Sequence, residues 1–220
     1  MATKYTVHPE TPQAYCCDRI VNELRDGAVM LYPTDTVYAI GCDMNVKSAV
    51  ERVRQIKRLS NEKPLTFLCG SISNTAAYAQ VSDTAYRIMR HLVPGPYTFL
   101  LPATKQVPKL VMNPKRKTTG IRIPDHNVSQ ALLNALGSPI ISTSAHPLPP
   151  EFTKHHDIPF LQRMDLFDEL EKFVDLIVDN EQENQTQVST IIDLTGDEIK
   201  ILRQGLGWEA AADLVSQMTY

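Results

Sequence analysis

Hydroxyl and carboxylate side chains follow an apolar run near residue 32, at the point where a strand is expected to end. The segment YPTDTVYAIG over residues 32–41 places Thr34, Asp35 and Thr36 in succession. Because ligands of α/β proteins tend to bind at the carboxyl ends of strands, these groups could contact a substrate. Asp35 and Thr36 could also satisfy backbone amides in an ordinary turn. Taken alone, this segment favours the turn.

Cations gather in two further segments. Lys57, Arg58 and Lys63 lie where a predicted helix ends and the next strand begins. The helix dipole and solvation explain such cations, and a functional role requires both lysines to converge on phosphates. Arg122 alternates with two flanking isoleucines, so it projects from the opposite face of its predicted strand. An arginine in mid-strand usually has an anionic partner, which could be either a structural carboxylate or a ligand.

The fourth segment, STSAH over residues 142–146, places hydroxyls directly after a predicted buried strand. A serine nucleophile would need flanking elbow glycines and a paired base, and the spacing indicates neither. Binding of a phosphate or carboxylate by the backbone and by the hydroxyls of Ser142 and Ser144 is the better interpretation. The common phosphate-binding signatures GxxxxGK[ST] and GxGxxG are absent from the sequence, and so is a regular His/Cys ligand set.

Short apolar runs bounded by Pro or Gly predict strands, and apolar residues at helical spacing predict helices. The predicted strands cover residues 28–32, 65–69, 97–101, 120–123, 139–142, 175–178, 188–194 and 199–203. The predicted helices cover residues 46–59, 83–92, 128–136, 159–173 and 208–218, with Asp83 as an N-cap and Gly137 as a C-cap. This alternation favours an α/β fold in which helices cover a sheet.

The composition is that of a globular chain with no overall signal for a polyanionic partner. The 220 residues suit one large domain, or a domain with a tail, and the formal net charge is −3 with a pI near 6.1. Attraction for a nucleic acid would therefore have to come from a local patch. The sequence has no apolar run of transmembrane length and no CxxC spacing, so a cytoplasmic protein with reduced thiols is the simplest interpretation.

Taken in order, these segments resemble the YrdC-like family, which includes the threonylcarbamoyl-adenylate synthases. The resemblance runs from about residue 14 to residue 205. It rests on the ordered motifs YPTDTVYAIG, KPL, PGPYT, RIP and STSA, followed by STIID at residues 189–193 and RQG at residues 203–205. Each motif is short, but so many in the correct order are hard to obtain by chance.

The resemblance implies a YrdC-like, twisted, open, mixed sheet flanked by helices, with a concave basic cleft. It divides the chain into an N-terminal extension over residues 1–13, a YrdC-like domain over residues 14–205, and a C-terminal helix or tail over residues 206–220. The implied reaction converts ATP, L-threonine and bicarbonate into threonylcarbamoyl-AMP and pyrophosphate, for threonylcarbamoyladenosine modification of tRNA. Mg2+ would accompany the triphosphate, with no dedicated protein metal site.

The family's binding roles carry over to eight residues of this chain. The residues that would bind ATP are Lys57, Lys63, Ser142, Ser144 and Arg203. The residues that would bind threonine are Thr34, Arg122 and Ser189. The resemblance identifies no catalytic side chain, since the protein would mainly position anions and neutralise their charge.

Two positions depart from the synthase pattern. The synthases typically carry Lys-x-Arg at the helix end, where this chain has Leu59 in place of the arginine, and Ser-x-Asn, where it has His146 in place of the asparagine. With these departures and the opening VHPE at residues 7–10, the chain resembles the YciO-type branch of the family. The alternative function is therefore binding of double-stranded RNA or tRNA without full synthase activity. Another ATP-dependent adenylylating or hydrolysing activity is a third possibility.

Overall fold

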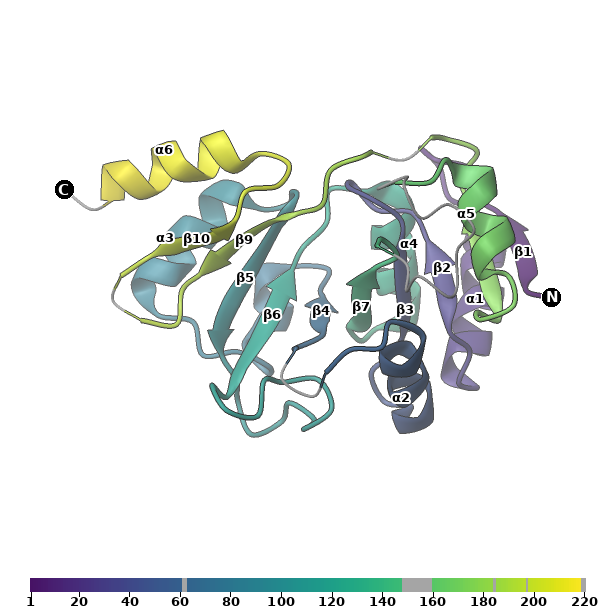
Figure 1. Cartoon of the computed structure of the whole chain (residues 1–220), viewed down its shortest axis with the longest axis horizontal. Coiled ribbons are helices and arrows are strands. Elements are labelled where there is room, and N and C mark those ends of the chain that lie inside the picture. The colour runs from purple at the N-terminus through teal and green to yellow at the C-terminus, as the bar shows by residue number, and fades with distance from the viewer. Residues whose placement is uncertain (61–62, 148–159, 184, 197, 219–220) are drawn as a thin grey trace.

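The computed structural model describes residues 1–60, 63–147, 160–183, 185–196 and 198–218. Over these residues the chain forms one ten-stranded mixed sheet, in the order β1-β8-β2-β3-β7-β4-β6-β5-β9-β10 (Figure 1). The strands are β1 (Thr3–Thr6), β2 (Met30–Tyr32), β3 (Ala39–Asp43), β4 (Thr66–Leu68), β5 (Tyr97–Pro102), β6 (Thr118–Arg122), β7 (Ile140–Ser144), β8 (Leu176–Asp179), β9 (Thr190–Asp193) and β10 (Lys200–Arg203). The predicted α/β class with an open mixed sheet is confirmed.

Six α-helices flank the sheet in the described part of the chain. They are α1 (Ala14–Arg25), α2 (Lys47–Ile56), α3 (Asp83–Leu92), α4 (Asn127–Leu136), α5 (Arg163–Leu170) and α6 (Trp208–Met218), and a short 3-10 helix covers Ile72–Thr75. Helices α1 and α4 pack against each other and share one hydrophobic cluster with Met30, Leu68 and Ile140 of the sheet. Helices α2, α3 and α5 contribute to the larger cluster, which contains Phe67 and Phe99.

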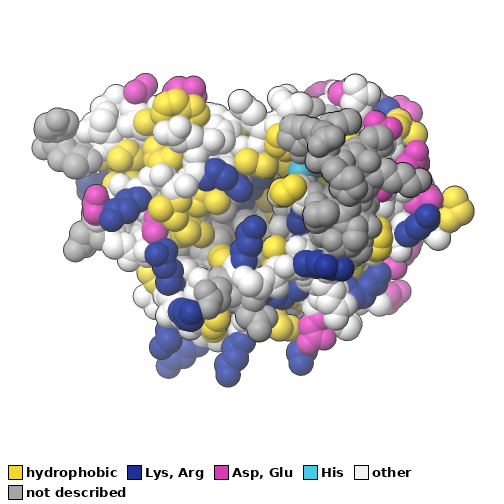
Figure 2. Space-filling view, viewed as in Figure 1, with side chains coloured by type: hydrophobic (Ala, Val, Ile, Leu, Met, Phe, Trp, Pro, Cys, Tyr) yellow, Lys and Arg dark blue, Asp and Glu magenta, His cyan; other side chains and the backbone are white. Residues whose placement is uncertain are grey.

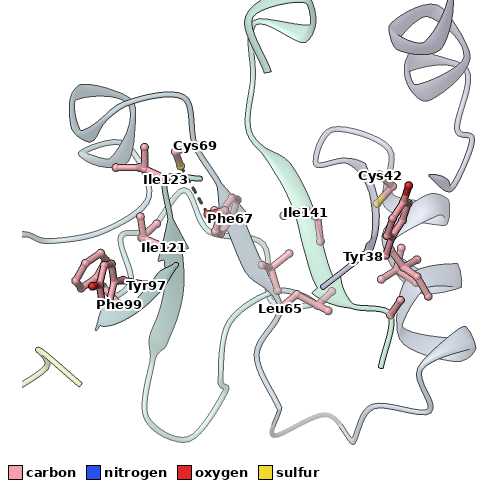
Figure 3. Packing of buried hydrophobic residues seen from close by; sticks show 14 of the residues in the cluster. Tyr38, Cys42, Leu65, Phe67, Cys69, Tyr97, Phe99, Ile121, Ile123 and Ile141 are labelled. Carbon is pink, nitrogen blue, oxygen red and sulfur yellow. Dashed lines mark hydrogen bonds between the residues drawn. The ribbon is translucent and has the colours of Figure 1, made fainter. Parts of the chain in front are cut away.

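The two faces of the central strands differ because side chains alternate along each strand. Phe67, Phe99, Ile121 and Ile141 occupy register positions opposite one another in β4, β5, β6 and β7. All four are fully buried and lie in the larger cluster (Figure 3). This face of the sheet is therefore apolar, and burying it stabilises the fold.

The other face of the same strands carries polar side chains. Thr98 lies opposite Arg122 in β5 and β6, and Thr66 lies opposite Ser142 in β4 and β7. The predicted orientation of Arg122 is confirmed, since the isoleucines on either side of it are buried in the core while Arg122 lines an open cleft. A period of two thus provides an apolar core on one side of the sheet, while the other side divides between these polar groups and the apolar Leu68 and Ile140, which pack with α1 and α4.

The helix boundaries differ from the prediction at several ends, most of all in α5, which covers Arg163–Leu170 where a helix over residues 159–173 is predicted. Ser82, not Asp83, is the N-cap of α3, because the Ser82 side chain accepts a hydrogen bond from a backbone N–H of the first turn at 3.2 Å. Helix α2 ends at Ile56, earlier than predicted, and Arg58 beyond it adopts a left-handed φ of 46°. Gly137 is the predicted C-cap of α4, with a φ of 74°.

Three elements have no counterpart among the predicted ones, namely β1, α1 and β3. Strand β1 lies parallel to β8 at one end of the sheet, and Val7 after it is fully buried. Residues 1–13, expected from the sequence to form an extension, thus contribute a strand to the sheet. At the other end of the chain, α6 contacts α3. None of the helices in the described residues is long and apolar enough to span a membrane.

Candidate functional site

A cleft of about 420 Å³ lies on the polar face of the central strands. Figure 2 shows Lys and Arg side chains around a hollow in this face of the molecule. Seven of the eight residues predicted to bind substrates line this one cleft: Lys57, Lys63, Arg122, Ser142, Ser144, Ser189 and Arg203. Among the described residues that line the cleft there are four Lys or Arg and no Asp or Glu. The local charge is thus unlike the slightly negative charge of the whole chain.

The strand wall of the cleft, defined by Thr98, Arg122, Ser189 and Arg203, begins with a buried ion pair. The Arg122 guanidinium donates to Asp35 Oδ1 at 2.5 Å and to Thr36 Oγ1 at 2.8 Å. The exposed fractions of the Arg122 and Asp35 side chains are 11% and 9%. The partner of Arg122 is therefore a structural carboxylate. The Nε atom of Arg122 is buried and has no hydrogen-bond partner among the described residues.

Arg203 completes the strand wall from the edge strand β10. Its Nε donates to the Ser189 carbonyl oxygen at 2.9 Å, and a terminal nitrogen donates to Ser189 Oγ at 3.0 Å. Ser189 Oγ also shares a hydrogen bond of 2.8 Å with Thr98 Oγ1. Burial, and then the charge of Arg122, lowers the pKa of Arg203. Gly205 permits this packing, since a Cβ at that position would lie 2.2 Å from the carbonyl oxygen of Val188.

The loop wall is defined by Lys57, Leu59, Lys63 and His146. Here Lys57 is held by main-chain carbonyl groups rather than by side chains. Lys57 Nζ donates to the carbonyl oxygen of Ala145 at 2.8 Å and also to that of Pro147. These two bonds link the end of α2 to the segment that follows β7. Burial, and then the nearby charge of Lys63, lowers the pKa of Lys57 to about 8. The Lys57 ammonium is thus partly neutralised near physiological pH.

His146 is the most enclosed member of the loop wall, with an exposed fraction of 3%. Its ring lies edge-on to the ring of Phe160, with the centroids 5.3 Å apart. Its Nε2 is buried and has no hydrogen-bond partner among the described residues. Burial, and then the charge of Lys57, lowers the pKa of His146 to about 4, so the imidazole is neutral at pH 7.

The two serines of β7 lie between the walls and differ in their partners. Ser142 Oγ shares a hydrogen bond of 2.6 Å with the hydroxyl of buried Tyr32. Ser144 Oγ donates to the carbonyl oxygen of His146 at 2.6 Å. The hydroxyls predicted from the STSA motif therefore face the cleft, and Ser144 also orients the turn that carries His146.

Thr34 lies apart from the other seven predicted residues. It lines a separate pocket of about 140 Å³, together with Asp35, Tyr38 and His126. Its hydroxyl donates to the Val37 carbonyl oxygen at 2.8 Å and accepts from the Thr36 backbone N–H at 3.1 Å. The local hydrogen bonding of a turn, which the sequence favours for this segment, accounts for Thr34 in this structure.

Arg54 is a positioning residue that the sequence analysis missed. It is 8% exposed, and its guanidinium donates to the carbonyl oxygens of Lys63 and Leu110 at 3.1 Å each, and to that of Ser60. It therefore fixes the main chain from which Lys63 projects. Helical periodicity indicates only a polar face for Arg54, and the loop carbonyls that it binds leave no pattern in the sequence. Over the described residues no group of three His, Cys, Asp or Glu could hold a metal ion.

The comparisons with known proteins agree with this architecture. The family model Sua5_yciO_yrdC, described as "Telomere recombination", matches residues 22–205. The chain belongs to the Sua5/YciO/YrdC family. Escherichia coli YciO, a curated protein with no characterised function, is 39% identical over 207 residues, which cover 94% of this chain and 97% of YciO. The threonylcarbamoyl-AMP synthase of Bos taurus is 30% identical over 200 residues, covering 90% of this chain and 70% of the synthase.

Comparison of this member of the Sua5/YciO/YrdC family with solved structures likewise shows greater similarity to YciO. The crystal structure of E. coli YciO superposes with a TM-score of 0.85 at 37% identity, and covers 94% of this chain and 97% of YciO. Pyrococcus abyssi Sua5 complexed with L-threonine has a TM-score of 0.80 at 24% identity, covering 93% of this chain and 58% of Sua5, which shows a shared fold. The predicted family is confirmed, and identity is higher with YciO than with the Bos taurus synthase or with Sua5.

Proposed function

We propose that the cleft is a basic nucleotide-binding site and that the chain is a threonylcarbamoyl-adenylate synthase-like enzyme. In this reaction the amine of L-threonine and bicarbonate form a carbamate with loss of water. The carbamate carboxylate attacks the α-phosphorus of ATP, and pyrophosphate leaves. The observation that carries the proposal is the convergence of Lys57, Lys63, Arg122 and Arg203 on one cleft beside serine hydroxyls. Such a group can bind a triphosphate and a carboxylate together.

The threonine subsite of the proposal lies on the strand wall. Arg122 already pairs with Asp35, so a substrate carboxylate would contact its remaining donors or the neighbouring Ser189 and Arg203. Relatives support this substrate class, since one curated relative is a threonylcarbamoyl-AMP synthase and a more distant structural relative was solved with L-threonine. Thr34 could reach this ligand only after its present hydrogen bonds rearrange.

The two departures from the synthase pattern fall on the loop wall. Leu59 lines the cleft, so the missing arginine removes a cation from the site itself rather than from a remote surface. His146 also lines the cleft and replaces a small neutral amide with a bulkier ring. We therefore expect slower turnover than in synthases that carry both residues, because an arginine stabilises transferring phosphate charge.

Pyrophosphate release from ATP tests the proposed reaction, with threonine and bicarbonate added singly and together. Release should require both, and Lys57→Ala should lower it at least about tenfold because the triphosphate loses a charged contact. Lys105→Ala, at an exposed lysine outside the cleft, is the matched control. The combined variant Leu59→Arg/His146→Asn should raise the rate. Pyrophosphate release that does not depend on threonine would exclude the synthase activity for this chain.

Binding of double-stranded RNA or tRNA is the second candidate, favoured by a group of exposed cations between β5 and β6. The group consists of Lys105, Lys109, Lys115, Arg116 and Lys117. Figure 2 shows Lys and Arg side chains along the lower rim of this face. Such a surface would contact phosphates and the shape of a duplex rather than base sequence.

Salt dependence separates RNA binding from nucleotide turnover. Affinity for a short RNA duplex should fall steeply as salt rises, and Lys115→Glu/Lys117→Glu should weaken it. The same double variant should leave ATP-dependent pyrophosphate release unchanged. RNA affinity equal in the wild type and in this variant would remove the exposed cations from the proposed function.

A further inference from the structure

A buried polar nitrogen in the loop wall has no partner. His146 Nε2 is enclosed and unbonded among the described residues, in a side chain that lines the cleft and is 3% exposed. Leaving a buried polar atom unpaired costs free energy, so such atoms are rare and call for an explanation. Here the unpaired atom lies beside the site of the proposed function, where an incoming ligand could bind it.

We propose that His146 contacts the anionic ligand of the cleft through Nε2, and that the imidazole takes up a proton as the ligand binds. The ligand class is a polyphosphate, whose oxygens accept hydrogen bonds. A neutral imidazole donates from only one of its two ring nitrogens, whereas an imidazolium donates from both and its bonds to an anion are charge-assisted. The inference deepens the proposed function, because it rests on the cleft binding a polyphosphate.

The charges around His146 explain why binding and protonation are coupled. Lys57 is the charged group that acts on the ring, and Lys63 in turn acts on Lys57. Arg122 and Arg203 face the same cleft from the strand wall, and the ring also contacts the apolar Phe160. Without a ligand, burial and the charge of Lys57 oppose an imidazolium. A bound polyphosphate supplies the missing negative charge and reverses that balance.

Proton uptake has a defined direction and two separable sources. A ligand that raises the pKa of a group binds more tightly as the pH falls through the pKa of the complex. His146, with a pKa of about 4 in the free protein, would take up its proton near pH 6. Lys57, with a pKa of about 8, would take up its proton near pH 8. A variant at either position should therefore remove uptake in one pH range only.

The experiment uses the full chain, inorganic pyrophosphate as the probe, and two readouts. Carbon-13 NMR of labelled histidine follows the titration of His146, whose signal is assigned by its loss in His146→Asn. Saturating pyrophosphate should move the midpoint from about 4 toward that of an ordinary histidine, about 6.5. Calorimetry at pH 6, in buffers of different ionisation enthalpy, should show proton uptake that His146→Asn loses and His91→Asn, at an exposed histidine, retains.

The outcomes separate this inference from the proposed function. An unchanged His146 midpoint at saturating pyrophosphate, or no pyrophosphate binding at all, overturns the inference, and the titration itself is followed in the wild type. A shifted midpoint without threonine-dependent pyrophosphate release rejects the synthase reaction but leaves the inference standing. Proton uptake at pH 6 that is equal in the wild type and in His146→Asn also overturns it.

Discussion

The two walls of the cleft hold their cations by different means. On the strand wall, Arg122 lies on β6 and Arg203 lies on β10 of the same sheet. Arg122 binds the side chain of Asp35, and Arg203 binds the side chain of Ser189. On the loop wall, Lys57 binds main-chain carbonyls and has no carboxylate partner among the described residues. Burial therefore lowers the pKa of Lys57 to about 8. Arg122 on the strand wall is thus paired with a negative charge before any ligand binds, whereas the hydrogen bonds of Arg203 and Lys57 go to neutral groups.

This difference coincides with the difference from the synthases. The residues that depart from their pattern, Leu59 and His146, both lie on the loop wall. The strand wall keeps the RIP, STIID and RQG motifs. The departures from the synthase pattern therefore fall on the wall whose Lys57 binds main-chain carbonyls, and not on the wall that contains the Arg122–Asp35 ion pair.

The largest expected effect comes from breaking the ion pair of the strand wall. Arg122→Met leaves the Asp35 carboxylate buried without its charged partner, so the free energy of unfolding should fall by about 3 kcal/mol. Urea denaturation at pH 7 measures the loss. In the double variant Arg122→Met/Asp35→Asn the buried charge is gone, so most of the stability should return. A double variant as unstable as the single one would contradict this account of the strand wall.

A smaller effect is expected from the loop wall on acidification. Because the pKa of His146 is about 4 in the folded state, against about 6.5 in the unfolded chain, the unfolded state binds the extra proton between these values. Stability contributed by neutral His146 is present above pH 6.5 and is lost as the pH falls toward 4. Between pH 7 and pH 5 the wild type should lose about 2 kcal/mol more than His146→Asn.

Urea denaturation of both proteins at the two pH values checks this expectation. Other groups that titrate in this range contribute equally to both proteins and cancel in the difference. His91→Asn, at an exposed histidine, serves as the control. Equal losses in the wild type and in His146→Asn would show that the imidazole is not held neutral by the loop wall.

The strand wall was the more predictable of the two from sequence. Alternation of Arg122 with buried isoleucines fixes its face, and strand order then brings Thr98 beside it. The partner choice between a structural carboxylate and a ligand was open, because Asp35 is remote in sequence. The loop wall depends on the bonds of Lys57 and Arg54 to main-chain carbonyls, and any residue type supplies a carbonyl. Periodicity therefore cannot reveal these contacts.

Thr34 shows the same limit for a single motif. The YPTDTV segment is a family signature, yet its threonine hydroxyl bonds within its own turn and lines a separate small pocket. Strand β3, which follows it, was missed since Gly41 interrupts its apolar run. A Cβ on Gly41 would lie 2.8 Å from the Tyr32 ring, so the glycine is required by packing between neighbouring strands.

The smallest expected effect sharpens the comparison within the loop wall. Arg54→Lys keeps the charge but replaces a forked donor that reaches several loop carbonyls with a single ammonium. The free energy of unfolding should fall by only about 1 kcal/mol, the net value of one or two hydrogen bonds. Affinity for pyrophosphate should fall as well, because Lys63 projects from the main chain that Arg54 fixes.

Lys47→Arg, at an exposed position of the same helix, is the control for urea denaturation and for calorimetry. Unchanged pyrophosphate affinity in Arg54→Lys would mean that the loop wall is positioned without Arg54, leaving the Lys57 bonds to Ala145 and Pro147 as its principal anchor.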